Sequence, residues 1–177
     1  MKGIIFSEFL ELVETQFGLD VCQAMLDESD DEGIYTTVGT YDHRYLVKLI
    51  ITLSRLTGIS PEQLQEVYGE SLFINLFRSM PELEGATSGT FEFISKVEEY
   101  IHIEVKKLYP DANPPTFKFI SKSSAQLLMD YISVRCMSHV CLGLIKGCAK
   151  HFNENIDIEM APQNEDGSVV RFKLTCH

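Results

Sequence analysis

The sequence predicts an α+β protein with helices in its first half and a small antiparallel sheet in its second half. Up to residue 109 the apolar residues recur at helical spacing, and beyond the proline-rich segment 110–115 they alternate with period two. The order of elements, helices first and then β-β-α-β-β, is typical of this class. We expect a helical N-terminal subdomain, 1–65, packed on a subdomain, 66–177, that holds a four-stranded antiparallel sheet and further helices.

Four stretches up to residue 109 have the periodicity and the boundary residues of helices. Glycine interrupts the first and closes the second, and a serine N-cap followed by proline begins the third. The predicted helices are 1–26 with a break at Gly18, 43–57 closed by Gly58, Ser60-Pro61 towards Arg78, and 91–109. The sequence GATSGT, 85–90, predicts a flexible connection before the last of them.

The residues after 115 predict two hairpins on either side of one helix. The first hairpin turns near 122–124, and the second turns at the Glu-Asp-Gly sequence of 165–167. The predicted elements are a strand around Phe117 and Phe119, a strand around Leu127, Met129 and Tyr131, a helix over 137–152, and strands near 155–160 and 168–175.

The composition is that of a soluble, acidic, globular chain. Hydrophobic residues make up 45% of its 177 residues, enough for one buried core, and the formal net charge is −11. This charge argues against nucleic acid or an anionic membrane as the main target, and no apolar run approaches the ~20 residues that span a bilayer. Early acidic residues argue against a secretory leader, and five cysteines without paired spacing favour reduced thiols, so we expect a cytoplasmic location. No heptad repeat indicates an obligate dimer, and we expect a monomer.

Three polar residues stand out on the second predicted strand. Tyr131, Ser133 and Arg135 alternate with apolar residues, and alternation along a strand would place all three on one face. Two hydroxyls and a guanidinium in a row can hold an extended anionic group, because Arg binds carboxylates through two parallel hydrogen bonds. The alternative is a strand with an ordinary solvent-facing polar side.

A single histidine lies at the edge of an apolar helical stripe. His102 follows Ile101 in the predicted helix 91–109 and is not at the centre of its apolar face. A histidine in this position is suited to packing, and it is equally suited to bind a flat hydrophobic cofactor through one ring nitrogen. The residues themselves leave both alternatives open.

Together these features resemble the heme nitric oxide/oxygen binding (H-NOX) family. The resemblance covers essentially the whole chain and rests on residues in a fixed order. These are Met1-Lys2-Gly3-Ile4-Ile5, His102, Pro114-Pro115, Tyr131-x-Ser133-x-Arg135, and a helix with Leu142-Gly143-Leu144. The resemblance implies one domain, 1–177, that holds heme b (protoporphyrin IX iron) between its two subdomains.

The resemblance also implies roles for individual residues. His102 would be the proximal ligand of the heme iron, and Pro115 would press on the porphyrin and keep it distorted. The donors to the two heme propionates would be Tyr131, Ser133 and Arg135. The residues near the heme or on its distal side would be Ile5, Phe9, Val140 and Leu144, with Phe73 or Ile74 as a further candidate whose register the sequence does not fix.

Position 140 determines the gas that the resemblance implies. Members that bind oxygen stably carry a distal tyrosine there, whereas Val140 has no hydrogen-bond donor and His139 points about 100° away on the helix. We therefore expect a nitric oxide sensor that also binds carbon monoxide in vitro. Nitric oxide would bind opposite His102, the iron–histidine bond would break, and the N-terminal helices would shift. The alternative is an oxygen-binding or a thiol- or heme-based redox regulator of the same fold.

The sequence does not predict an enzyme. It contains no glycine-rich phosphate loop and no paired catalytic carboxylates. Animal guanylate cyclase subunits carry a similar domain, but no cyclase portion is present here, so we expect signalling by contact. Stand-alone bacterial members regulate a sensor histidine kinase, as in two-component signalling, or a cyclic-di-GMP synthase or phosphodiesterase, and the residues do not indicate which.

The cysteines leave a question open. Some members of the family have a zinc-binding or redox-active thiol cluster near the C-terminus. This chain has Cys136, Cys141 and Cys176, but no cysteine or histidine between 153 and 175, so a four-ligand zinc site has little support. Cys141 and Cys148 lie at helical spacing beside Leu144 and are better explained as packing residues.

Overall fold

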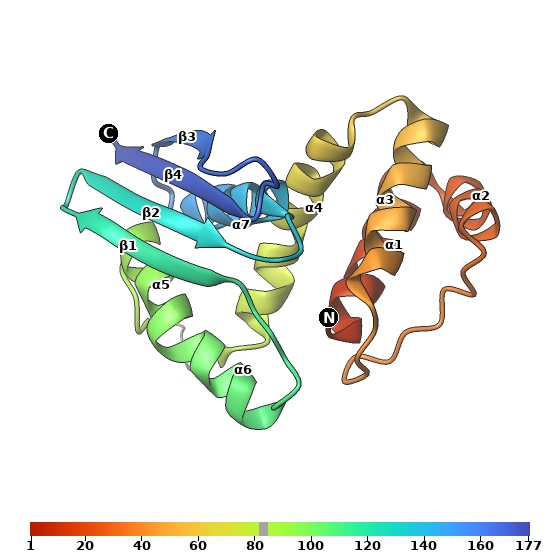
Figure 1. Ribbon diagram of the computed structural model, residues 1–177, viewed down its shortest axis with the longest axis horizontal. Helices are drawn as coiled ribbons and strands as arrows, with labels where there is room; N and C mark the ends of the chain where they lie inside the picture. Colours follow the sequence, from red (N-terminus) through yellow and green to blue (C-terminus); the bar gives the residue numbers. More distant parts are fainter. Residues whose placement is uncertain (82–84) are drawn as a thin grey trace.

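A computed structural model describes residues 1–81 and 85–177 as two lobes joined by one long helix (Figure 1). The helical lobe contains α1 to α3, the sheet lobe contains the four strands with α5, α6 and α7, and α4 runs between them. The elements are α1 (Gly3–Phe17), α2 (Leu19–Ser29), α3 (His43–Thr57), α4 (Pro61–Arg78), α5 (Thr90–Lys96), the π-helical turn η2 (Val97–Ile101), α6 (His102–Leu108), β1 (Thr116–Lys122), β2 (Gln126–Ile132), α7 (Ser138–His151), β3 (Ile156–Pro162) and β4 (Val169–Cys176).

Local signals define the helices of the first lobe. Gly18 separates α1 from α2 with a φ of 88°, a conformation that suits glycine. Asp42 caps α3 through its side chain, and Gly58 closes it in the left-handed region. Ser60 and Gln63 form a reciprocal capping box at the start of α4, with proline in the first turn. These boundaries confirm the predicted helices.

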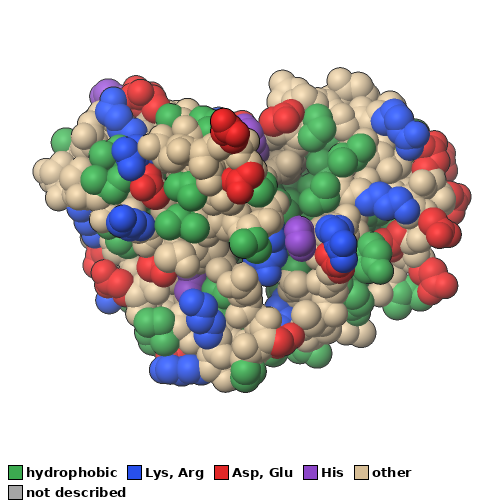
Figure 2. All heavy atoms as spheres, viewed as in Figure 1, with side chains coloured by type: hydrophobic (Ala, Val, Ile, Leu, Met, Phe, Trp, Pro, Cys, Tyr) green, Lys and Arg blue, Asp and Glu red, His purple; other side chains and the backbone are tan. Residues whose placement is uncertain are grey.

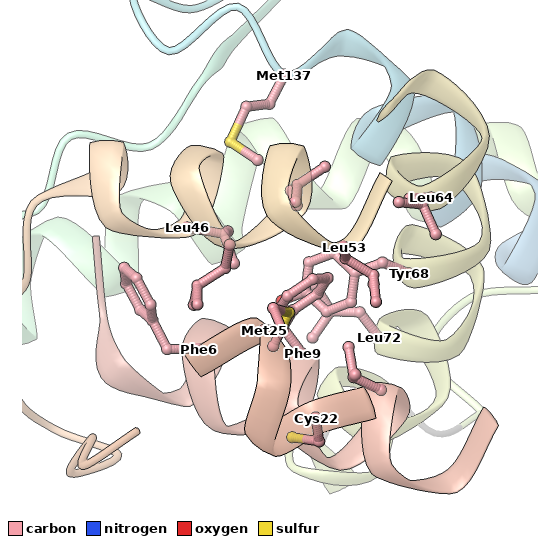
Figure 3. Packing of buried hydrophobic residues seen from close by; sticks show 13 residues of the cluster. Phe6, Phe9, Cys22, Met25, Leu46, Leu53, Leu64, Tyr68, Leu72 and Met137 are labelled. Atoms are coloured by element: carbon pink, nitrogen blue, oxygen red, sulfur yellow. The ribbon is translucent and has the colours of Figure 1, made fainter. Parts of the chain in front are cut away.

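The core of the helical lobe is built from one face of each of its helices (Figure 3). Because apolar residues recur at helical spacing, each helix directs a stripe toward the same centre, where Phe9 packs edge-on against Tyr68 of α4 with ring centroids 5.2 Å apart. The buried members are Phe6, Phe9, Val13, Cys22, Met25, Leu46, Leu49, Ile50, Leu53, Leu64, Tyr68, Leu72 and Met137. We refer to this set as the helical core.

The sheet is antiparallel with the strand order β1-β2-β4-β3. β2 lies in the middle, so that Tyr131 faces Phe117 on β1 and Val170 on β4. Alternate residues of the central strands point to one face, where they form a second core with Ile94 of α5 and with residues of α7 such as Ile145. The predicted four-stranded antiparallel sheet is therefore confirmed.

Helices α4 and α7 approach each other unusually closely. A Cβ atom on Gly69 of α4 would lie 2.2 Å from the carbonyl oxygen of Val140, and one on Gly143 of α7 would lie 2.0 Å from the carbonyl oxygen of Glu66. Glycine at both positions lets the two backbones touch. The contact brings the Val140 side of α7 against the helical core, while the other side of α7 packs under the sheet.

Two predicted boundaries differ from the structure. The predicted helix 91–109 is interrupted by η2, whose wider turn is closed by a hydrogen bond from the N–H of His102 to the carbonyl oxygen of Val97. The predicted strand through 135 ends at Ile132, because its partner β4 begins at Val169 and the ladder has no further pair.

The boundary expected at 65/66 falls within α4, which contributes to the helical core and also packs on α7. No helix in the described part of the chain is both long and apolar enough to cross a membrane.

Candidate functional site

His102 begins α6 directly after the π-helical turn. Its side chain is mostly buried, and its ring lies 5.5 Å from the ring of Phe117 on β1, measured between centroids. Burial lowers the pKa of His102, although hydrogen bonding to Glu98 and the charge of Glu98 oppose the shift. The lowered pKa favours the neutral ring, which is the form that binds a metal.

One ring nitrogen of His102 is already bonded and the other is not. Nδ1 lies 2.9 Å from the Oε2 atom of Glu98, one turn earlier. Since a carboxylate only accepts, Nδ1 carries the hydrogen in this contact. Nε2 has no hydrogen-bond partner among the described residues, and it is the atom left to coordinate a metal.

The three polar residues at 131–135 lie on one side of the chain, but not on one strand as predicted. Tyr131 belongs to β2, whereas Ser133 and Arg135 lie in a turn that begins where the ladder ends. In this turn the N–H of Cys136 bonds to the carbonyl oxygen of Ser133. Burial still alternates as on a strand. Tyr131 and Ser133 are buried and Arg135 is half-buried, whereas the intervening Ile132 and Val134 are exposed.

The environment of Tyr131 favours hydrogen bonding by its neutral hydroxyl. Burial raises its pKa to about 12, while hydrogen bonding with Ser133 and the charge of Arg135 act in the opposite direction. Tyr131 packs against Phe117, with ring centroids 6.2 Å apart. Because Phe117 also contacts His102, one aromatic ring connects the histidine to the polar residues.

Two other ionisable nitrogen groups, the Met1 amine and the His43 ring, lie near Arg135. Its guanidinium donates to the carbonyl oxygen of Asn113 and forms no ion pair within the described residues. Burial and then the charge of Arg135 lower the pKa of the N-terminal amine of Met1, and the same two causes lower the pKa of His43. The guanidinium of Arg135 and the amine of Met1, beside the hydroxyls of Tyr131 and Ser133, suit an anionic carboxylate group.

The segment that carries Pro115 is attached to both lobes. On the sheet side, the N–H of Phe117 donates to Glu98 at 2.9 Å. On the helical side, the hydroxyl of Thr40 donates to Asp111 at 2.8 Å, and the ammonium of Lys2 lies 3.5 Å from the same carboxylate. Pro115 is half-buried between these attachments, and its effect on a porphyrin stays a prediction.

The residues expected on the distal side come from α1 and α7 and pack around the helical core. Phe9 is buried there, and Ile5, Val140 and Leu144 are half-buried beside it. The hydroxyl of Tyr68 lies in the same region, but it donates to the backbone carbonyl of Ile5. In the space-filling view the surface is hollowed between the two lobes, and hydrophobic side chains gather along the hollow (Figure 2).

The structure also places the two uncertain candidates of α4. Phe73 is buried in an aromatic group with Phe77 and Phe93, away from Phe9 and Tyr68. Ile74 is half-buried at the edge of that group and borders a surface hollow between α1 and α4 that Leu12 also lines.

The cysteines do not gather. Burial raises the pKa values of Cys22, Cys141 and Cys148, the last to about 12, which makes these thiols poor nucleophiles. Cys136 is exposed in the turn after β2, and Cys176 is half-buried at the end of β4. Within 1–81 and 85–177 no three histidine, cysteine or acidic side chains are close enough together to hold a metal ion.

Sequence reasoning missed four residues of this site. Glu98 had a local signal, since it lies four residues before His102 on the same predicted helix. The period-two pattern places Phe117 on a strand and nothing more, because its contact with His102 depends on how that helix packs on the sheet. Met1 and His43 approach Arg135 only because the lobes meet there, and no local pattern predicts this.

The donor set fits a heme. A neutral buried histidine with a free Nε2, a cationic cluster with hydroxyls for carboxylates, and an apolar wall from α1 and α7 are the groups that an iron porphyrin with two propionates needs. His102 would hold the iron, and Tyr131, Ser133 and Arg135 would hold the propionates.

Comparisons with known proteins place the chain among heme-binding domains. The family model described as Haem-NO-binding matches residues 2–160. The unliganded Fe(II) H-NOX protein from K. algicida is 38% identical with a TM-score of 0.94, and the match covers 100% of this chain and 97% of that one. The H-NOX protein from Shewanella woodyi, solved in solution with IWP-051 in the Fe(II)CO state, is 35% identical with a TM-score of 0.83, covering 99% and 94%.

A more distant structure has the same fold. The H-NOX protein from S. oneidensis in the Fe(II)NO state is 21% identical with a TM-score of 0.89, and the match covers 100% of this chain and 99% of that one. No curated protein sequence matches. The family match over most of the chain and the 38% identity over its whole length show that this protein belongs to the Haem-NO-binding (H-NOX) family of heme-binding domains.

Proposed function

We propose that this chain is a heme b-based nitric oxide sensor of the bacterial cytoplasm and not an enzyme. When bound, the ferrous heme would supply the metal site that takes nitric oxide, and carbon monoxide in vitro, with His102 as its protein ligand. The observation that carries the choice of gas is the apolar distal wall: Val140 has no donor, and the nearby hydroxyl of Tyr68 is committed to the carbonyl of Ile5. Bound oxygen needs a hydrogen-bond donor, whereas nitric oxide does not.

The chain's own residues account for holding and orienting the group. His102 coordinates through Nε2, and Tyr131, Ser133 and Arg135 bind the propionates at the meeting of the lobes. Ile5, Phe9, Val140 and Leu144 exclude water from the other side. Pro115 is held by a segment fixed at both ends, which suits a residue that maintains a distorted ring.

The same attachments support a route for the signal. If His102 were released when nitric oxide binds, one link between α6 and the heme would be lost. The segment 109–115 connects that region to Lys2 and Thr40 in the helical lobe. We propose that the lobes then shift against each other and alter contact with a partner, a sensor histidine kinase or a cyclic-di-GMP synthase or phosphodiesterase. A monomer is the expected sensing unit.

Optical spectra of the reduced protein test the choice of gas. The spectrum recorded under nitrogen should be unchanged by brief exposure to air and should change on addition of nitric oxide. A stable oxygen complex would contradict the nitric oxide assignment and favour an oxygen-binding regulator. A protein that purifies without heme, and that takes up none when heme is added, would contradict the proposal as a whole.

Activity assays test the signalling step. Purified partner kinase or cyclic-di-GMP enzyme would be measured with the unliganded protein and with the nitric oxide complex. The proposal expects the two forms to differ in their effect on the partner's rate. Equal effects of both forms on each class of partner would contradict regulation of these enzymes by this protein.

A further inference from the structure

One carboxylate oxygen connects the metal ligand to the sheet. Oε2 of Glu98 lies 2.9 Å from Nδ1 of His102 and also accepts the backbone N–H of Phe117 at 2.9 Å. The Glu98 side chain is 23% exposed and that of His102 is 12% exposed, so the contact is partly shielded from water. Glu98 therefore joins the start of α6 to the first residues of β1, just after Pro115.

The π-helical turn places these groups together. The N–H of His102 reaches back five residues to the carbonyl oxygen of Val97, and this wider turn begins immediately before Glu98. The two side chains thus extend from consecutive turns toward β1. Such single wide turns often occur at functional sites, where they redirect one side chain.

The bond to Glu98 has two consequences for a metal-binding histidine. It fixes the hydrogen on Nδ1 and directs Nε2 away from Glu98, so the ring needs no reorientation to coordinate. An ionised acceptor also draws the Nδ1 hydrogen toward itself, and this increases the electron density that Nε2 donates to the metal.

We propose that Glu98 is a positioning residue that orients His102 and strengthens its bond to the heme iron. The assignment rests on the proposed function of this site, because it needs His102 to be the iron ligand. If Glu98 served only to stabilise the helix, its contacts would affect folding and leave the iron–histidine bond unchanged.

Three variants of the full-length, heme-loaded protein separate these roles. Glu98→Gln keeps the shape of the side chain and removes its charge, and Glu98→Ala removes the acceptor. Glu99→Gln is the matched control, because Glu99 is the exposed neighbour in the same turn and its substitution changes the net charge equally. Each would be measured as the reduced, unliganded protein and by circular dichroism to check folding.

The first readout is the iron–histidine stretching band in resonance Raman spectra. Glu98→Gln should lower its frequency, Glu98→Ala should lower it further, and Glu99→Gln should leave it unchanged. The midpoint potential should rise in the same order, because a less electron-rich histidine stabilises ferric iron less. Heme loss to a competing apoprotein should be about 10-fold faster in Glu98→Ala, at the lower end of the effect of removing such partners.

Each outcome decides the assignment. Unchanged frequency and potential in both Glu98 variants would overturn it, as would equal shifts in Glu98→Gln and Glu99→Gln, which would indicate only the net charge. The wild-type protein could bind heme and show no iron–histidine band, or show a band that persists in His102→Gly. Either result would mean that His102 is not the ligand. In that case the proposed site fails, and the role of Glu98 fails with it.

Discussion

At the scale of single residues, position 140 is where the proposed preference for nitric oxide over oxygen can be tested. Val140 lies on the side of α7 that packs against the helical core, as does Leu144, and Phe9 of α1 is a member of that core. The Tyr68 hydroxyl, which lies in the same region, already donates its hydrogen bond to a backbone carbonyl of α1. A donor can therefore be introduced by substitution at 140 without competing with an existing hydrogen bond there.

Val140→Tyr should slow the loss of bound oxygen by about 10-fold or more, since one hydrogen bond to a polarised acceptor contributes about 1.5–3 kcal/mol. Stopped-flow measurement of oxygen dissociation gives the rate, after the reduced protein has been loaded at an oxygen pressure well above that of air. Val140→Phe is the control for the size of the ring, and it should not slow oxygen loss. Similar effects of both variants would show that packing and not the hydroxyl controls the gas.

At the scale of elements, the first half of the fold can be predicted from the sequence because each helix carries its own boundary signals. Gly18, Gly58 and the Ser60 cap act locally, and the structure places helix ends at these residues. The end of β2 cannot be predicted in this way, because burial continues to alternate through Arg135 while the ladder stops at Ile132. Strand pairing depends on where the partner strand begins, which is information from another part of the chain.

The candidate site is likewise only partly predictable from the sequence. His102 and the residues 131–135 follow from the order of residues along the chain, and the structure brings them near one another through Phe117. The wide turn before His102 is not predictable from the periodicity, because one extra residue moves an apolar stripe by a single position. The bond between Glu98 and the N–H of Phe117 depends on tertiary packing of a helix on a strand.

An ion pair on the outer face of the sheet gives its stability a pH dependence. Asp130 on β2 faces Arg171 on β4, with oxygen–nitrogen distances of 2.8 and 3.0 Å. Hydrogen bonding from Arg171 lowers the pKa of Asp130, although burial opposes this. Because the folded-state pKa is below the unfolded value of about 3.9, the pair stabilises the fold above that pH and the contribution is lost as pH falls through the folded value.

Asp130→Asn should therefore lower the free energy of unfolding by about 1–2 kcal/mol at pH 7, and the difference from the wild type should shrink below about pH 3.9. Urea unfolding at a series of pH values measures this. Glu159→Gln removes a more exposed pair with Lys173 on the same sheet and should cost less than about 1 kcal/mol. If the difference in unfolding free energy between Asp130→Asn and the wild type stayed constant with pH, the ion pair would not be the source of the pH dependence.

The contact between α4 and α7 depends on glycine. Gly143→Ala should lower the free energy of unfolding by about 1–3 kcal/mol, because the added Cβ would overlap backbone atoms at Glu66 and Gly69 that cannot rotate away. Thermal unfolding of the heme-loaded protein measures this loss. Ser71→Ala, at an exposed position of α4, should have little effect. An unchanged midpoint in Gly143→Ala would mean that the two helices can separate freely.

At the scale of the whole molecule, the site is formed where two lobes meet. Ile5 and Phe9 belong to the helical lobe, His102 and Arg135 belong to the sheet lobe, and α4 and the segment 109–115 connect them. A ligand that contacts both lobes binds only when they are correctly assembled. Its binding therefore stabilises the folded state by an amount that grows with its concentration relative to its dissociation constant.

Arg135→Gln tests this linkage. If its guanidinium holds a propionate, the variant should bind heme about 10-fold more weakly, and at equal free heme the stabilisation by heme should fall by about 1.4 kcal/mol. Without heme the variant should be no less stable than the wild type, because the substitution removes a positive charge that faces the Met1 amine and His43. Chemical unfolding with and without heme separates the two effects. Equal destabilisation under both conditions would instead assign Arg135 a structural role through its bond to the carbonyl of Asn113.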